Sequence, residues 1–145
     1  MLDKCLIGHR LGTFSADVEK GRLQFFAKAI GQDQPIYFDE VAARAAGHRS
    51  LPVPPTFLKC LESDGRDLQA MLALLGWDLG RVLHAEQAFT YHRMAYAGDT
   101  LTFSGVISDL YEKKGGALQF VVLDSQVTNQ HGEHVADVRT SLVHR

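Results

Sequence analysis

The sequence predicts one α+β domain, and three observations support this. Apolar residues recur at helical spacing through roughly the first half of the 145-residue chain. After residue 82 the chain changes to runs rich in Val, Phe, Thr and Tyr, which are typical of strands. Hydrophobic residues make up 46% of the chain and charged residues 22%, which is an ordinary globular composition. Helices followed by strands over this length indicate one α+β core across residues 1–145.

Two helices are predicted in the first third of the chain. The first covers residues 17–30, where apolar side chains follow the helical period and Gly31 stands where a C-terminal cap belongs. The second covers residues 40–46, with Asp39 as its N-terminal cap. Residues 32–38, between the two helices, are predicted to form a non-helical connector.

Two further helices are predicted before the strands. Three prolines within residues 52–55 favour a rigid approach to a third helix, with Pro55 in its first turn. The pair Asp64-Gly65 ends that helix, and a fourth amphipathic helix covers residues 68–75. We expect the third helix to be central and to bury one apolar face, made of Phe57, Leu58 and Leu61.

Four strands are predicted in the second half of the chain, over residues 82–93, 100–112, 117–129 and 134–144. The turns between them are rich in Gly, Asp and Asn, which accept tight-turn geometry. This pattern indicates an antiparallel meander, and a further short strand is expected around residues 5–11. The predicted architecture is therefore a central apolar helix wrapped by an antiparallel sheet of about five strands.

The composition argues against several classes of function. A net charge of −2 without a basic stripe does not favour a nucleic-acid or anionic-membrane partner. The longest apolar run, residues 70–75, is far shorter than the roughly 20 residues that cross a bilayer, and the first residues do not resemble a signal peptide. We therefore expect a cytoplasmic protein. Cys5 and Cys60 should be free thiols, and no histidine or cysteine spacing predicts a metal or a cofactor.

Several strings in the sequence resemble the MaoC-like dehydratases. The longest is FAKAIGQDQPIYFD at residues 26–39, and shorter ones are VPPTF at 53–57, LHAEQ at 83–87, YHR at 91–93 and GDTL at 98–101. They are similar in particular to the FAS1-like, or N-terminal MaoC-type, dehydratase domain, over nearly the whole chain. The resemblance implies a hot-dog fold and a 3-hydroxyacyl or enoyl thioester of CoA or acyl carrier protein as substrate. It also implies a site at a subunit interface, in a homodimer or in a heterodimer with another hot-dog subunit.

The connector departs from the family pattern at the two positions that carry the chemistry. Family members that hydrate enoyl-CoA read Asp-x-Asn-Pro-x-His there, and the resemblance implies that this Asp and His handle water and protons. Aligned on Pro35, the two positions hold Gln32 and Tyr37 in this chain. Glutamine does not titrate, and tyrosine, with an unperturbed pKa of about 10, donates a hydrogen bond more readily than it acts as a base. Gln32 and Tyr37 are candidates for hydrogen bonding to a ligand, or simply polar residues of the connector.

The first predicted strand offers a replacement for the missing pair. His84, Glu86 and His92 are predicted to share one face of this strand. If that face lines the site, His84 with Glu86 could transfer protons. If it faces solvent, the three residues form the polar face that a half-exposed strand requires.

Substrate binding is predicted at two places. The N–H groups at the start of the third helix could hold a thioester oxygen, although the same residues could serve only as a helix cap. An arginine near the end of the first strand could meet a CoA phosphate, but such a residue is ordinarily solvated or ion-paired. The candidate substrate-binding residues are Pro55, Thr56, Phe57, His92 and Arg93.

Three functions remain open from the sequence. The first is a hydro-lyase with a rearranged site, whose candidate catalytic residues are Gln32, Tyr37, His84 and Glu86. The second is a non-catalytic hot-dog subunit that completes the acyl pocket of an active partner, as the replacement of both proton-transfer residues favours. The third is an acyl-thioesterase that uses Glu62 or Asp64 near the end of the third helix.

Overall fold

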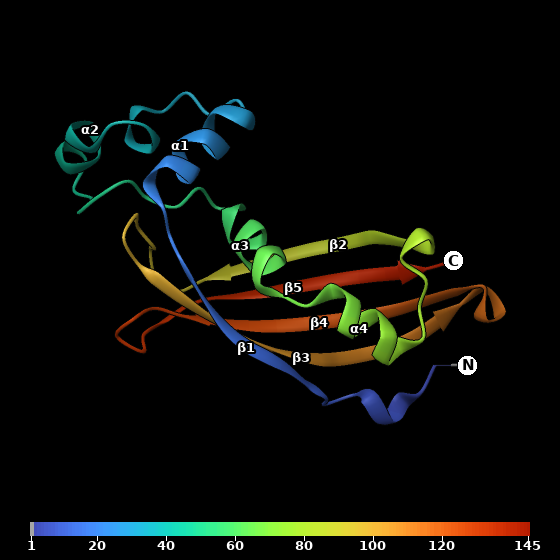
Figure 1. The fold of residues 1–145 in the computed structure, drawn as a ribbon. Coiled ribbons are helices and arrows are strands. Elements are labelled where there is room, and N and C mark those ends of the chain that lie inside the picture. The colour runs from blue at the N-terminus through green and yellow to red at the C-terminus, as the bar shows by residue number, and fades with distance from the viewer. Residues whose placement is uncertain (1) are drawn as a thin grey trace.

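The computed structural model describes residues 2–145. One antiparallel sheet of five strands, in the order β1-β3-β4-β5-β2, curves around two consecutive helices, α3 and α4 (Figure 1). The α+β class and the five-stranded antiparallel sheet are therefore confirmed. The strands are β1 (Arg10–Asp17), β2 (Val82–Tyr91), β3 (Thr100–Lys113), β4 (Leu118–Thr128) and β5 (His134–His144).

The four helices lie close to their predicted positions. They are α1 (Lys20–Ala29), α2 (Glu40–Ala45), α3 (Phe57–Gly65) and α4 (Leu68–Leu75). α1, α2 and the connector between them form a separate group at one end of the sheet, next to the start of α3 (Figure 1). None of the helices within residues 2–145 is both long and apolar enough to span a membrane.

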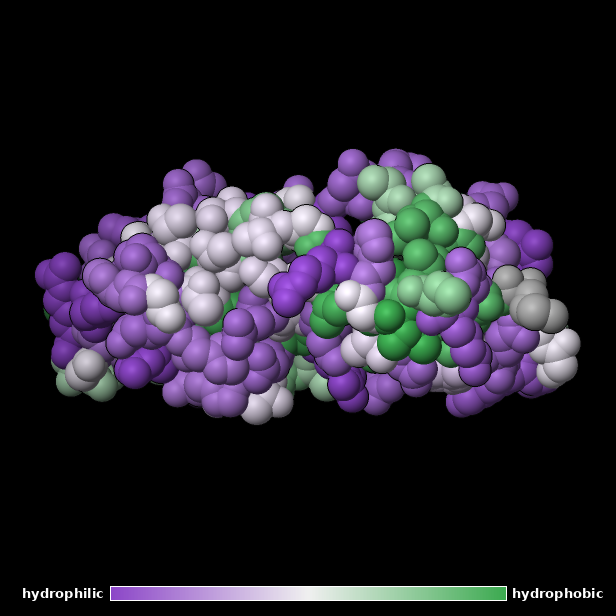
Figure 2. Space-filling model, turned by 90° about the horizontal axis from the view of Figure 1, so that it is seen from below, coloured by the Kyte–Doolittle hydropathy of each residue, from purple (hydrophilic) through white to green (hydrophobic). Residues whose placement is uncertain are grey.

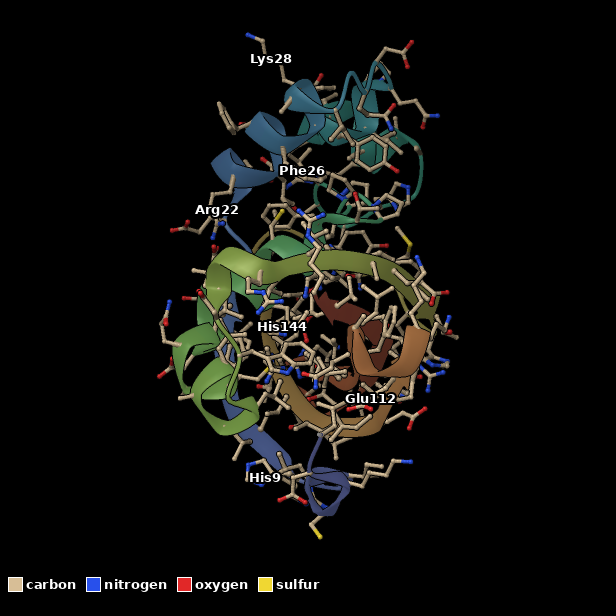
Figure 3. All side chains as sticks on the ribbon, turned by 90° about the vertical axis from the view of Figure 1, so that its right-hand side faces the viewer. His9, Arg22, Phe26, Lys28, Glu112 and His144 are labelled. Atoms are coloured by element: carbon tan, nitrogen blue, oxygen red, sulfur yellow. The ribbon has the colours of Figure 1, made fainter. Side chains whose placement is uncertain are left out.

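The core lies between the helices and the concave face of the sheet, which Figure 3 shows end-on. The predicted apolar face of α3 is confirmed, because Phe57, Leu58 and Leu61 are at most 2% exposed. They pack with Phe103 of β3 in one cluster, whereas α4 packs on a second cluster closer to the opposite end of the sheet. Burying this much apolar surface is the main favourable term for the fold.

The N-terminal strand lies further along the chain than predicted. β1 begins at Arg10 and ends at Asp17, whereas the sequence suggested a strand around residues 5–11 and a helix from residue 17. The strand persists because it pairs with β3 over its whole length, and Phe14 packs into the core cluster. Asp17 therefore belongs to the strand, and α1 begins only at Lys20.

The prolines before α3 lie outside the helix. The predicted helical first turn at Pro55 is wrong, because α3 begins at Phe57 with Thr56 as its N-cap. Pro52 instead forms a bridge to Tyr96. This segment is held in extended form because the loop after β2 pairs with it.

Hydrophobic surface gathers at the end of the molecule that holds α4, on the right in Figure 2. A groove between β1 and α4 lies there, lined partly by Leu11, Met71 and Leu74. Leu74 remains 37% exposed, so α4 is not fully covered by the chain's own residues.

Gly65, the last residue of α3, permits close packing of the helix on β1. A Cβ at this position would lie 2.1 Å from the Phe14 ring, a distance that no real Cβ tolerates. We expect Gly65→Ala to lower the free energy of unfolding by about 1–3 kcal/mol, because the ring must move out of the core. Urea denaturation measures this directly.

Gly21 in α1 provides the matched control, because nothing lies within 4 Å of the corresponding Cβ position. Gly21→Ala should raise stability by up to about 1 kcal/mol through helix propensity alone. Equal effects of the two substitutions would contradict the packing explanation for Gly65.

Candidate functional site

The connector between α1 and α2 uses Gln32 for its own structure. The Gln32 Oε1 atom accepts hydrogen bonds from the backbone N–H groups of Asp33, at 3.0 Å, and Gln34, at 3.2 Å. The Gln32 side chain thus stabilises the turn that leads into the short 3-10 helix Pro35–Tyr37. It cannot titrate, and its acceptor oxygen is occupied within the loop.

Tyr37 reaches a pocket of about 250 Å³ at the start of α3, which we call the helix-start pocket. Pro55 and Leu58 line its helix side, and Tyr91 and Met94 line it from the end of β2 and the following loop. The remaining lining residues are Val53, Arg93, Ala95 and Val135, so that Arg93 is the only charged one. An apolar pocket with a few polar groups is the usual form of a site for an acyl chain or similar ligand.

Tyr91 is the second tyrosine that lines this pocket. Burial raises the pKa of Tyr91 to about 12, so the phenol stays protonated at neutral pH. Tyr91 is therefore suited to hydrogen bonding and poorly suited to act as a general base.

The backbone N–H groups of Phe57 and Lys59 at the start of α3 bond within the same turn. The Phe57 N–H donates to the Pro54 carbonyl at 2.9 Å, and the Lys59 N–H donates to the Thr56 carbonyl at 3.2 Å. The Thr56 side chain makes no capping bond. Of the predicted binding segment, Pro55 lines the helix-start pocket, whereas Phe57 is buried in the core.

His84 and Glu86 do not share a face of β2, so that prediction is wrong. The pairing of β2 with β5 shifts between them: His84 lies opposite Leu142, and Glu86 lies opposite Ser141. Adjacent residues of β5 point to opposite sides of the sheet, and Leu142 packs into the core cluster around α4. A bulge at Ala85 thus sends the two side chains to opposite faces.

The structure places His84 away from the helix-start pocket. The His84 Nε2 atom lies 3.0 Å from the Glu86 carbonyl oxygen, and the ring borders a different pocket, beside Lys59 and Glu62. Glu86 carries a charge near Arg139 on the other face of the sheet. The two residues therefore cannot act together on one ligand.

His92 belongs to a cluster that sequence spacing did not reveal. The Nε2 atoms of His92 and His134 each lie 2.8 Å from an oxygen of Asp137, and their rings are 4.2 Å apart. Burial would raise the pKa of the Asp137 carboxyl, but the hydrogen bonds from both imidazoles lower it. Two imidazoles and a carboxylate are ligands that a zinc-like ion accepts, so these three residues could hold one. Residue spacing does not indicate this cluster, because His92 lies just after β2 whereas His134 and Asp137 lie on β5.

Arg93 makes an ion pair at the rim of the helix-start pocket. An Nη2 atom of Arg93 lies 3.5 Å from the Glu133 carboxylate, and both side chains are exposed. Its guanidinium remains open to solvent, where such pairs contribute little to stability.

The thioesterase candidates Glu62 and Asp64 are both engaged in ion pairs. Asp64 pairs with Arg22 at the surface. Glu62 is 2% exposed and accepts hydrogen bonds from Lys59 at 2.9 Å, from Arg66 at 3.1 Å and from the Ser125 hydroxyl. Neither carboxylate is available beside the helix-start pocket.

A buried polar network therefore lies between α3 and the sheet, and the sequence did not predict it. Its members are Lys59, Glu62, Arg66, Ser125 and Thr140. Burial alone would raise the pKa of the Glu62 carboxyl, but the Lys59 ammonium, the Ser125 hydroxyl and the Arg66 guanidinium together lower it. Glu62 thus stays ionised inside the fold.

These features define a hot-dog protein with an apolar pocket at the start of its central helix. The model of the FAS1-like dehydratase domain region matches residues 5–138, so the chain belongs to this family. The UPF0336 protein Lxx02810 of Leifsonia xyli is 39% identical over 130 residues, covering 88% of this chain and 85% of that protein. The UPF0336 protein SCO4636 of Streptomyces coelicolor is 33% identical, covering 99% of this chain and 95% of its own length.

Solved structures agree with this assignment. The HadBC (3R-hydroxyacyl-ACP dehydratase) complex of Mycobacterium tuberculosis has a chain that is 27% identical, with a TM-score of 0.81 and coverage of 95% of this chain and 96% of that chain. A MaoC-like dehydratase has a TM-score of 0.85 at 22% identity, covering 96% of this chain and 42% of its own. The resemblance to the MaoC-like dehydratases and the hot-dog fold are therefore confirmed.

Proposed function

We propose that this chain is a non-catalytic subunit of a heteromeric dehydratase or hydratase acting on 3-hydroxyacyl or enoyl thioesters of CoA or acyl carrier protein. It supplies an acyl pocket, and a partner hot-dog subunit supplies the Asp and His that transfer protons. The observation that carries this proposal is the lining of the helix-start pocket, which contains one arginine and no carboxylate or imidazole. Such a pocket can hold an acyl chain but offers no ready general base.

The rearranged-site alternative loses its main support. It needs His84 and Glu86 beside the same ligand, and the bulge separates them. Gln32 cannot titrate, and Tyr91 remains protonated at neutral pH. The described residues around the pocket therefore bind and orient a ligand without an acid/base pair of their own.

The sheet edge supports a partner of the same fold. Within residues 2–145, β2 pairs only with β5, so its outer edge presents unpaired backbone groups. Leu83 and Tyr91 on this strand and Met94 just beyond it are each about half exposed, at 45–51%. A second hot-dog subunit at this edge would pair these groups and cover the three side chains, of which Tyr91 and Met94 line the helix-start pocket. The M. tuberculosis HadBC structure, whose chain is similar to this one, is itself a complex.

Enoyl-thioester hydration, followed by ultraviolet absorbance of the conjugated bond, tests the proposal. The assay compares the chain alone, a hot-dog partner with an intact Asp-x-Asn-Pro-x-His connector, and the two co-expressed. We expect background rates for the chain alone and a gain of at least about tenfold over the partner alone when both are present. His84→Ala in this chain should change the kcat of the complex by less than about threefold. Turnover by the chain alone that His84→Ala abolishes would refute the proposal.

A further inference from the structure

A second pocket, of about 210 Å³, lies at the other end of α3 and borders the buried polar network; we call it the network pocket. We propose that it binds a small amphiphile that ends in a carboxylate. This inference does not rest on the proposed function, because the network pocket shares no lining residue with the helix-start pocket. Its polar wall is formed by Lys59, Glu62, Ser63, Arg66, His84 and Thr140.

The acceptor atoms of the network already have donors. Glu62 Oε1 accepts from Arg66 and Ser125, and its Oε2 accepts from Lys59. Thr140 Oγ1 accepts from Lys59 at 3.1 Å and donates onward to Gln87 Oε1 at 3.0 Å. A ligand that only donates hydrogen bonds would therefore find few free acceptors here.

Donor atoms, in contrast, are left over. The Lys59 ammonium has three N–H groups and uses two of them, on Glu62 and Thr140. The Arg66 side chain is only 10% exposed, and its Nε atom is buried without any partner among the described residues. The third Lys59 N–H therefore favours a ligand that brings an acceptor oxygen, and the Arg66 guanidinium adds positive charge beside it.

The charge balance favours an anion. Lys59 and Arg66 carry two positive charges against the one negative charge of Glu62, and His84 adds positive charge when protonated. In a partly buried site, where charges are less screened than in water, this excess attracts a carboxylate and repels an ammonium group.

The rest of the pocket is apolar and small. Leu68 and Met71 line it from α4, and Leu123 and Leu142 line it from the sheet. A volume of about 210 Å³ lies below the roughly 300 Å³ at which drug-sized sites begin, so the apolar part of the ligand must be short. A medium-chain fatty carboxylate such as octanoate has this combination of a single anionic end and a short tail.

Titration calorimetry of the full chain at pH 7 with octanoate, 1-octanol and octylammonium tests the site. Octanoate should bind about ten- to a hundredfold more tightly than octanol, the ratio that a charge-assisted hydrogen bond supplies, and octylammonium should bind weakest. Equal affinity for octanoate and octanol, or no octanoate binding at millimolar concentration, would overturn the proposal.

Variants locate the binding. Lys59→Met leaves Glu62 paired with Arg66. It should lower the affinity for octanoate at least about tenfold and leave the affinity for octanol nearly unchanged. Lys59→Arg should restore most of the octanoate affinity, which a purely structural role of Lys59 would not predict. Lys28→Met is the matched control, because Lys28 projects from α1, away from the sheet (Figure 3). This variant should bind octanoate with wild-type affinity. Loss of octanoate binding in the Arg93→Met variant but not in the Lys59→Met variant would place the ligand in the helix-start pocket and refute the inference.

Discussion

Arg66→Met is expected to lower the free energy of unfolding by about 2–4 kcal/mol. The substitution leaves Glu62 and Ser125 without the guanidinium that bonds to both, at 3.1 and 3.0 Å. Glu62 keeps Lys59 as an ion-pair partner, but the buried Glu62 Oε1 and Ser125 Oγ atoms lose a charged donor, which costs more than the intact bonds contribute. Arg66 also stacks over the Phe14 ring, so packing is lost as well.

Arg139→Met is the control for this prediction. Arg139 makes a bidentate pair with Asp124, at 2.7 Å for both contacts, but its side chain is 59% exposed. We expect a loss of less than about 1 kcal/mol, because solvent screens the pair. Chemical denaturation of both variants measures the contrast, and similar losses would contradict the importance assigned to the buried network.

The same network should make stability depend on pH. The pKa of the Glu62 carboxyl is lower in the folded chain than in the unfolded chain, where it is about 4.3. Its contribution is therefore fully present above this unfolded value and is lost as the pH falls through the folded one. Glu62→Gln should therefore reduce the fall in the free energy of unfolding between about pH 5 and pH 2, measured by chemical denaturation at each pH. An unchanged pH dependence of the free energy of unfolding would show that other carboxylates cause the acid sensitivity.

Met94→Asp is expected to lower the kcat/KM of the assembled complex by about 10- to 100-fold. Met94 lines the helix-start pocket, and a carboxylate there would have to be desolvated against an acyl chain. Because Met94 is 51% exposed, the variant should fold with nearly wild-type stability. Steady-state kinetics, together with size-exclusion chromatography to show that the complex still forms, measures the effect.

Val41→Asp is the matched control for the pocket prediction. Val41 lies on α2, is 75% exposed and does not line the helix-start pocket. It should leave kcat/KM within about twofold of the wild type. Equal activity of the Met94 and Val41 variants would show that the acyl chain does not occupy this pocket.

The elements of the fold were largely predictable because hydrophobic periodicity determines which face is buried. The apolar face of α3 followed from residue spacing, and the four C-terminal strands followed from runs rich in Val, Phe, Thr and Tyr between turn residues. β1 was misplaced because its position depends on pairing with β3, which contributes no local signal. Phe14 shows this, since it is buried by contacts with distant segments.

The site was less predictable, because it too depends on contacts between segments that are far apart in the sequence. The bulge at Ala85 arises from the register between β2 and β5, and one extra residue reverses the alternation on which the His84 and Glu86 prediction depended. Glu62 was predicted only as a candidate for thioester hydrolysis, and its spacing from Arg66 gives no sign that the sheet covers both residues. Only the sheet packed over them makes the pair buried.

The most direct test of a non-catalytic role is to inactivate the partner instead of this chain. The partner's connector Asp and His would both be replaced by Ala, and the complex with wild-type protein would be assayed for enoyl-thioester hydration. We expect activity to fall to background, because the described pocket residues of this chain offer no acid/base pair. Activity that persists at about a tenth or more of the original rate would show that this chain performs proton transfer itself, and would contradict the proposed function.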